Sequence, residues 1–478
     1  MTKACFGVRA ALVQQALAEK FPSTPGSLLE LARRLHAGEL SPWEASEESL
    51  KRIRRSNETL NCFVATGGAV TERHARALER SMDGERPLLW GVPVSMKDLA
   101  STQGMPTTFS SRAFAGHVPT KDAPLAAAMK AAGMVIVGKT NTPEFGILPT
   151  TESELNGICR NPWSLDWSAG GSSGGAAASV AAGLTAVAQG SDGAGSIRIP
   201  ASCCGVFGVV LPHGRVPTSE RVAVGRGPQD GVFGRSVADV LYYLTGMNAI
   251  SERELDLALE VACSGRPESV VLSCTPPIDC FVDPACEEAA HRAAELLGVS
   301  GCQISERKFE WASESIMNDM MLLRSVIPVS FGDPAPELLD RSTRNALRLS
   351  EQLCALELQR THLRLHGYAQ RILTLFAEDE VLLTPVVARP GVRHGWITEP
   401  SDPVEVFRRA AEFAPFAAFV NLAGLCAVSV PLGWSSDGLP IGVQLASRPG
   451  KLASLLGLSA RLERLAPWAH RMPTNHFG

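Results

Sequence analysis

Seven short segments of this chain are almost continuously apolar, and helical stretches separate them. A strand buried on both faces of a sheet has this appearance, because none of its side chains meets water. Buried strands separated by helices predict an α/β fold built around one central sheet with helices packed on it. The region from about 300 to 415 is the least patterned part of the chain, and we expect it to cover the core. The segments are WGVPVSMKD (90–98), MVIVGKTN (134–141), LTAVAQGS (184–191), ESVVLSC (268–274), DEVLLTPVV (379–387), CAVSVPLGW (426–434) and PIGVQLAS (440–447).

Helix signals lie between these segments. The stretch 26–57 predicts two amphipathic helices around GELSP, with Ser41 as the N-cap and Pro42 at the first helical position. Residues 122–133 predict a helix that Gly133 ends. An alanine-rich helix is expected over 174–184, and further helices over 341–377.

Composition excludes several classes of protein. The 478 residues are 45% hydrophobic and 20% charged, with a net charge of −4, so there is no basic surplus to bind nucleic acid. We find no run of about twenty apolar residues that would span a membrane. Residues 1–21 interleave charged with apolar side chains and do not read as a secretory signal, so we expect a cytoplasmic protein.

The twelve cysteines show no spacing typical of a metal site or a disulfide framework. The nearest approach to a cluster is formed by Cys274, Cys280 and Cys286, whose spacing fits no zinc pattern. We therefore expect reduced thiols and no metal.

Three motifs carry possible chemistry, and the first is the lysine in GVPVSMKD. Lys97 ends an apolar strand, where a lysine is less expected than at the surface. Strand side chains alternate, so Lys97 and Asp98 are expected to face opposite sides and not to pair directly. Taken alone, this lysine is more readily explained as a strand-end side chain that reaches water.

The second motif is AGGSSGGAAASVAAG at 169–183. Two serines stand between two glycine pairs, directly before the alanine-rich helix, and a glycine-rich turn before a helix can cradle an anion. The spacing fits neither a P-loop nor a dinucleotide-binding motif. A tight turn with serine caps explains the motif equally well.

The third motif is GSDGAGSIRIP at 190–200. Glycine at this density costs chain entropy, and it is typical of a backbone that turns sharply or comes close to a ligand. Such a turn can expose the hydroxyl of Ser196 and direct preceding N–H groups into the same space, as an oxyanion hole requires. No G-x-S-x-G elbow is present, and no histidine occurs between 118 and 212 to complete a familiar triad.

The three motifs in this order resemble the amidase signature family. Further segments look like family sequence in family order, including DAPLAAAMKAAGMVIVGKTNTPEFG, GSDGAGSIRIPASCCGVFG and VNLAGLCAVSVPLGWSSDGLPIGVQLASR. The resemblance covers roughly residues 27–470. It implies a mixed central sheet flanked by helices on both faces, in a single domain over 27–478 preceded by a helical extension over 1–26.

The resemblance also implies a Ser–cis-Ser–Lys triad that needs neither cofactor nor metal. The nucleophile maps to Ser196, the bridging serine to Ser172 and the base to Lys97. The oxyanion hole maps to the backbone N–H groups of Gly193, Ala194 and Gly195. Supporting roles fall to Ser173, Asp192 and Arg198, the last two holding the loop.

These residue types suit the implied chemistry. A serine hydroxyl is a weak nucleophile that needs a base, and a lysine serves as base only when neutral. Burial away from carboxylates favours the neutral form of lysine. Ala194 departs from the family pattern, which has glycine there, and its methyl group would conflict with a positive φ. We expect the turn to tolerate this alanine, because Gly193 and Gly195 remain on either side of it.

Four functions remain open. The favoured one is a self-standing amidase acting on a small-molecule carboxamide, with a homodimer as its possible assembly. The second is the amide-cleaving component of a tRNA-dependent amidotransferase, although such components usually carry glutamine where Ile199 stands. The third is an esterase or acyl transferase with the same triad, and the fourth a non-enzymatic binding protein.

The substrate does not follow from these motifs. We expect pocket walls from the loop 101–117 and from the stretch 310–420. Trp163 and Trp167 either shape a pocket wall or belong to the core.

Overall fold

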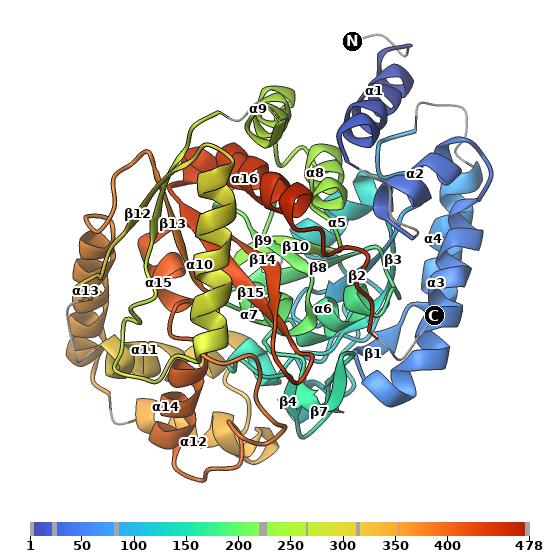
Figure 1. The fold of residues 1–478 in the computed structure, drawn as a ribbon. Coiled ribbons are helices and arrows are strands. Elements are labelled where there is room, and N and C mark those ends of the chain that lie inside the picture. Colours follow the sequence, from blue (N-terminus) through green and yellow to red (C-terminus); the bar gives the residue numbers. More distant parts are fainter. Residues whose placement is uncertain are drawn as a thin grey trace.

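The computed structural model describes residues 4–21, 26–80, 86–218, 227–263, 266–311, 316–351 and 353–473. Its centre is a mixed sheet of eleven strands in the order β1-β3-β2-β8-β10-β9-β14-β15-β13-β11-β12 (Figure 1). The strands are β1 Phe63–Thr66, β2 Pro93–Lys97, β3 Val135–Thr140, β8 Val187–Asp192, β9 Phe207–Val210, β10 Gln229–Gly234, β11 Ser269–Leu272, β12 Gln303–Glu306, β13 Glu380–Pro385, β14 Cys426–Trp434 and β15 Pro440–Ser447. All seven apolar segments thus contain strands of this sheet, as predicted.

The four remaining strands form two small hairpins, β4 Glu152–Ser153 with β5 Gly157–Ile158 and β6 Arg160–Asn161 with β7 Ser164–Ser168. The helices are α1 Ala4–Lys20, α2 Leu28–His36, α3 Pro42–Leu60, α4 Gly68–Arg80, α5 Pro124–Ala131, α6 Gly174–Ala181, α7 Arg198–Cys204, α8 Val237–Gly246, α9 Glu252–Cys263, α10 Pro284–Val299, α11 Ile316–Ser325, α12 Arg341–Ser350, α13 Ala355–Ile372, α14 Pro403–Phe413, α15 Ala418–Ala423 and α16 Leu452–Leu465. Short 3₁₀ turns occur at Arg112–Phe114, Glu144–Gly146, Ile327–Phe331, Pro336–Leu338 and Pro449–Lys451.

The local helix signals act as predicted. Ser41 caps α3 by accepting a hydrogen bond from the Glu44 N–H, and the Glu44 carboxylate accepts one from the Ser41 N–H in return. Pro42 occupies the first turn of the helix. Gly133 follows α5 with a φ of +89°, a left-handed conformation that glycine adopts without strain.

Helices cover both faces of the sheet, as the family resemblance implied. Adjacent strand residues point to opposite faces, so Val209 of β9 packs in one core cluster and Val210 in another. The first cluster holds the apolar sides of α8, α10 and α16, and the second holds those of α3 and α6. Both clusters are fully buried along the strands.

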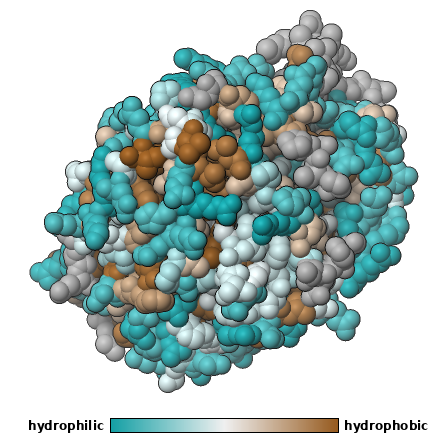
Figure 2. Space-filling view, in the orientation of Figure 1, coloured by the Kyte–Doolittle hydropathy of each residue, from teal (hydrophilic) through white to brown (hydrophobic). Residues whose placement is uncertain are grey.

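Figure 1 places α11, α12, α13 and α14 at one end of the molecule, beyond the sheet. These helices belong to the weakly patterned stretch that was expected to cover the core. Figure 2 shows that hydrophilic side chains cover most of the visible face and that hydrophobic ones gather only in small patches. In the part of the chain that the structure describes, no helix is long and apolar enough to cross a membrane.

Helix α1 lies against α8 through buried Val13 and Leu17, and the side chain of Gln14 donates a hydrogen bond to the hydroxyl of Tyr242 at 2.9 Å. The division into an extension over 1–26 and a single domain over 27–478 stays a prediction.

Candidate active site

The strand order brings two of the three motifs to one edge of the sheet. Strands β2 and β8 are parallel neighbours, with Val94 opposite Val187 and Ser95 opposite Ala188. Their carboxyl ends therefore lie at the same edge, where ligand sites of such sheets usually form. Lys97 ends β2, and the turn that carries Ser196 follows β8 directly.

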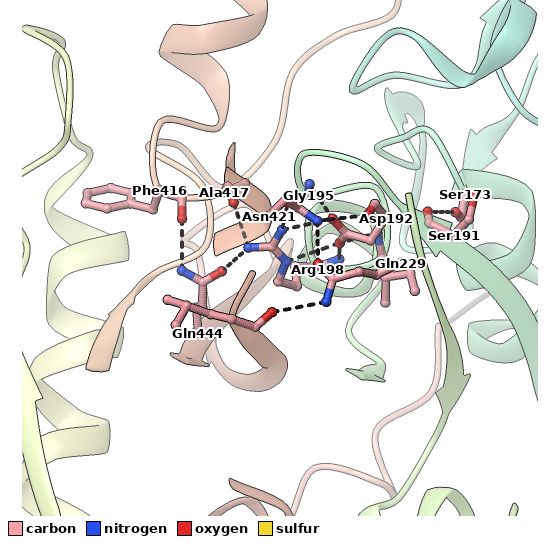
Figure 3. Close-up of polar contacts among 12 residues, drawn as sticks. Ser173, Ser191, Asp192, Gly195, Arg198, Gln229, Phe416, Ala417, Asn421 and Gln444 are labelled. Atoms are coloured by element: carbon pink, nitrogen blue, oxygen red, sulfur yellow. Dashed lines mark hydrogen bonds and ion pairs between the residues drawn. The ribbon is translucent and has the colours of Figure 1, made fainter. Parts of the chain in front are cut away.

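The second motif reaches the same place through the turn before α6. The Ser173 N–H donates to the carbonyl oxygen of Ser196 at 3.1 Å, and the Ser173 hydroxyl donates to the carbonyl oxygen of Ser191 at 3.1 Å. Ser173 thus ties the second motif to the third (Figure 3). The peptide bond between Gly171 and Ser172 is cis.

Lys97 points into this junction and not toward solvent. Its side chain is buried, with 1% of its surface exposed. The amine Nζ donates to the Ser172 hydroxyl at 2.8 Å and to the Ser191 hydroxyl at 3.0 Å. The alternative of a strand-end lysine that reaches water is therefore wrong.

Asp98 faces away from Lys97, as strand alternation predicted. Its Oδ2 accepts hydrogen bonds from the N–H and the hydroxyl of Thr108, and its Oδ1 lies 3.9 Å from the ammonium of Lys139 on β3. Burial lowers the pKa of Lys139 to about 8, although the Asp98 charge opposes this shift. Sequence reasoning overlooked this second buried lysine, because nothing in MVIVGKTN distinguishes it.

The turn after β8 wraps around the carboxylate of Asp192. Gly195 N–H donates to Oδ1 at 2.6 Å and Ile197 N–H donates to Oδ2 at 2.9 Å. Gly195 has a φ of +114°, which favours glycine, and a Cβ there would lie 2.5 Å from the Cβ of Ala417. Because the Gly195 N–H is bound to Asp192, it is not directed at a ligand in this structure.

Ala194 fits the turn without conflict. Its φ is not positive, because Gly195 carries the left-handed conformation. Among the described residues, the N–H groups of Gly193 and Ala194 donate no backbone or side-chain hydrogen bond. The turn therefore keeps two N–H groups available beside Ser196.

Arg198 anchors this turn to the far half of the sheet. It forms a fully buried ion pair with Asp192 at 2.9 Å. Its other donors reach the Ala417 carbonyl at 2.8 Å, Gln444 Oε1 at 2.6 Å and Asn421 Oδ1 at 2.7 Å (Figure 3). Asp192 and Arg198 thus hold the loop in place.

The ionisation of Asp192 follows from these contacts. Burial alone would raise the pKa of this carboxyl. The charge and hydrogen bonds of Arg198, with the N–H groups of Ile197 and Gly195, outweigh burial and lower the pKa to about 2. Asp192 is therefore ionised throughout the neutral range.

A cavity of about 440 Å³ opens onto the three motif residues. Lys97, Ser172 and Ser196 line its inner end and are 1%, 1% and 6% exposed. The outer wall comes from α11, the 3₁₀ turn Ile327–Phe331 and α13, within the stretch 310–420 that was expected to supply it.

The other expected wall segments do not line this cavity. The loop 101–117 lies behind it, where Phe109 packs against Phe331 with ring centres 5.1 Å apart. Trp163 donates a hydrogen bond to the Cys204 carbonyl, and Trp167 lies beneath the Arg393 guanidinium. Both tryptophans are thus packing residues.

Several residues at the site had no sequence signal. Asn421 and Gln444 lie more than two hundred residues from Asp192 in the chain, and no local pattern marks them. Arg324, His362 and His366 face the cavity from helices whose sequences look like ordinary surface helices. In the described ranges, no group of three or more His, Cys, Asp or Glu side chains is placed to hold a metal.

The fold and the site together define an α/β protein with a buried lysine–serine arrangement at the edge of a mixed sheet. The family model for amidases matches residues 44–456. The chain therefore belongs to the amidase family and is an amidohydrolase acting on non-peptide C–N bonds.

Three similar proteins illustrate the relationship. An acylamidase of Rhodococcus erythropolis is 31% identical over 475 residues, covering 94% of this chain and 97% of the relative. A component of the glutamyl-tRNA(Gln) amidotransferase of Geotalea daltonii is 32% identical over 480 residues, covering 92% and 97%. The solved structure of a 6-aminohexanoate cyclic dimer hydrolase in complex with substrate superimposes with a TM-score of 0.84 at 28% identity, covering 94% of this chain and 99% of that one.

Proposed function

We propose that this chain hydrolyses a small-molecule carboxamide through an acyl-enzyme on Ser196. The observation that carries the proposal is the hydrogen bond of 2.8 Å from Lys97 Nζ to Ser172 Oγ, at the inner end of the cavity that Ser196 also lines. A nucleophile, a bridging hydroxyl and a base are the three parts that such catalysis needs. The proposed reaction uses no cofactor or metal.

In the first half of the reaction, Ser196 Oγ attacks the amide carbon. Its proton passes to Ser172, whose own proton passes to the neutral Lys97 amine. The C–N bond breaks, and the leaving nitrogen takes a proton back along the same path. This leaves an ester between Ser196 and the acyl group, together with a free amine or ammonia.

In the second half, water attacks the ester carbon. Its proton follows the relay to Lys97, the bond to Ser196 Oγ breaks, and that oxygen regains a proton. The carboxylic acid leaves. The negative oxygen of each tetrahedral intermediate is stabilised by backbone N–H groups, and Gly193 and Ala194 have theirs available. Gly195 contributes by shaping the turn, since its own N–H is held by Asp192.

Covalent labelling tests the assignment of the nucleophile. A fluorophosphonate should add its mass to the tryptic peptide that contains Ser196, and Ser196→Ala should abolish both labelling and turnover while keeping the melting temperature. Ser202→Ala is the matched control, because Ser202 lies on α7 and its hydroxyl accepts a hydrogen bond from the Gly442 N–H. Labelling of another serine, or an active Ser196→Ala protein, would contradict the proposal.

The similarity to an amidotransferase component supports one alternative. If this chain had that role, it would release ammonia from glutamine and depend on partner proteins for full activity. Activity of the purified single chain on simple amides, without stimulation by tRNA, favours the self-standing amidase. Product analysis in the presence of competing amines distinguishes amide hydrolysis from esterase or acyl-transfer activity.

A cytoplasmic location, a homodimeric state and the absence of a nucleic-acid partner stay predictions. Light scattering of the purified chain measures the oligomeric state, and cell fractionation measures the location.

A further inference from the structure

Helix α11 contributes to the cavity wall an arginine that has no partner among the described residues. Arg324 lies in the last turn of α11 and lines the cavity together with Lys97 and Ser196. Its Nε is enclosed by protein and has no hydrogen-bond partner in the described part of the chain. Among the described residues, none forms an ion pair with its guanidinium. Arg324 is half-buried, and a partly buried cation costs free energy unless something else compensates its charge.

The described residues around Arg324 do not supply that compensation. The described residues that line the cavity include no aspartate or glutamate. The charge of Asp192 acts on Arg324, but that carboxylate is already bound by Arg198 and by two backbone N–H groups. Burial lowers the pKa of Arg324 to about 10, so the guanidinium is still charged at neutral pH.

Further hydrogen-bonding groups face the same cavity from α13. His362, His366 and Gln370 recur every four residues, so they lie on one face of this helix, and all three line the cavity. His362 Nε2 is a second buried polar atom for which the described ranges offer no hydrogen-bond partner. Helix α11 packs against α13, which brings the helix that carries Arg324 next to this face.

Apolar side chains complete this end of the cavity. Met320, Leu323 and Ile327 adjoin Arg324, and Leu365 adjoins the histidines along α13. A ligand group that compensates the charge of Arg324 must be negative and must match the geometry of one planar guanidinium. A carboxylate does so, because its two oxygens match the two parallel N–H donors of arginine.

We propose that the substrate is an amide that also carries a carboxylate, held by Arg324 while the amide carbon lies at Ser196. This inference rests on the proposed function and deepens it by naming the substrate class. The carboxylate neutralises the charge of Arg324, and the α13 groups donate further hydrogen bonds. A cavity of about 440 Å³ suits a small bifunctional molecule.

Binding to the inactive Ser196→Ala protein tests the inference without turnover. The probes are pairs that differ only in charge. One pair sets the monoamides of dicarboxylic acids with four to eight carbons against the alkanamides of equal length. The other sets 4-acetamidobenzoate against 4-methylacetanilide, which places the carboxylate on the leaving-group side. Calorimetry gives the ratio of the two dissociation constants in each pair.

In at least one pair, we expect the amide that carries a carboxylate to bind about 10- to 100-fold more tightly than its neutral counterpart, as one charge-assisted contact allows. That pair shows the chain length, or the acyl or leaving-group side, at which the carboxylate is recognised. Adding Arg324→Gln should bring this ratio close to one, and Arg324→Lys should keep part of it. The matched control is Arg348→Gln, which removes one exposed positive charge from α12 and should keep the full ratio. Equal binding of both members in every pair, or a preference that survives Arg324→Gln, would overturn the inference.

The two proposals fail in different ways. If the active chain is labelled on Ser196 and hydrolyses neutral amides, and no carboxylate is preferred, the substrate class is wrong and the amidase proposal stands. If carboxylates are preferred through Arg324 but Ser196 is neither labelled nor needed, the binding assignment stands and the mechanism is wrong.

Discussion

Asp192 and Arg198 form an ion pair of 2.9 Å in which neither side chain has any exposed surface. The same carboxylate accepts the N–H groups of Gly195 and Ile197, on either side of Ser196. One buried acid therefore shapes the turn that carries the proposed nucleophile, and one arginine holds that acid to β15 and to the segment around Ala417 (Figure 3).

Removal of this acid should destabilise the protein strongly. Asp192→Asn leaves the Arg198 cation buried without its counter-charge, and such a change typically costs about 3–5 kcal/mol in the free energy of unfolding. Urea unfolding at pH 7 measures the loss. Asp166→Asn is the matched control, because its ion pair with Arg393 is exposed, and it should leave the urea midpoint almost unchanged. Equal midpoints for the two variants would contradict the anchoring role.

Gly195 should not tolerate alanine. Its φ of +114° is strained for any other residue, and a Cβ would lie 2.5 Å from Ala417 Cβ, so Gly195→Ala should cost about 1–3 kcal/mol and lower turnover. Gly193→Ala serves as the stability control, because the nearest atom to its Cβ would be 3.8 Å away. Thermal melts of both variants make the comparison. A Gly195→Ala protein as stable as Gly193→Ala would show that the turn is more adaptable than we describe.

The buried carboxyl of Asp239 should make stability depend on pH. Burial raises its pKa to about 6, and its Oδ2 has no hydrogen-bond partner among the described residues. Between pH 3.8, which is the ordinary pKa of this carboxyl, and pH 6, Asp239 binds more protons in the folded state than in the unfolded state. Its contribution to stability is therefore present below about pH 4 and lost as pH rises to 6.

Asp239→Asn removes this titration. The variant should gain up to about 3 kcal/mol relative to the parent protein between pH 4 and pH 7, because its neutral amide does not lose a proton. Melting temperatures across this range measure the difference between the two proteins. Parallel curves would mean that Asp239 does not titrate as described.

Activity should not depend on a metal. The proposed mechanism uses only Lys97, Ser172, Ser196 and backbone N–H groups, so EDTA should leave the rate of amide hydrolysis unchanged. Loss of activity that added zinc restores would reveal a metal site and contradict this mechanism.

The sequence predicted the sheet and the meeting of the three motifs better than it predicted the cavity. Lys97, Ser172 and Ser196 lie in short motifs whose order along the chain is informative. The first and third motifs include the buried strands β2 and β8, which have an apolar pattern. Asn421 and Gln444 could not be predicted as anchors of the turn, because their role depends on strand order and not on neighbouring residues. The position of Arg324 in the cavity wall was not predicted either, since an arginine near a helix end usually faces water.

The hydrogen bonds of the N–H groups in the turn also could not be predicted from the sequence. The sequence indicated that the N–H groups of Gly193, Ala194 and Gly195 precede the serine, but not which of them is already used. Only the position of the Asp192 carboxylate shows that Gly195 donates internally. A pattern of glycines predicts freedom of the backbone and not the direction of each N–H.

Lys97 is proposed to act as a neutral base through Ser172, and this role is tested by measuring kcat/KM against pH for Lys97→Arg and the parent protein. We predict that activity of the parent falls on the acid side, because protonated Lys97 accepts no proton. We predict that Lys97→Arg loses about 10²–10⁴-fold at every pH while it stays folded, since a guanidinium remains protonated throughout. A Lys97→Arg protein with the rate and pH profile of the parent would contradict the account.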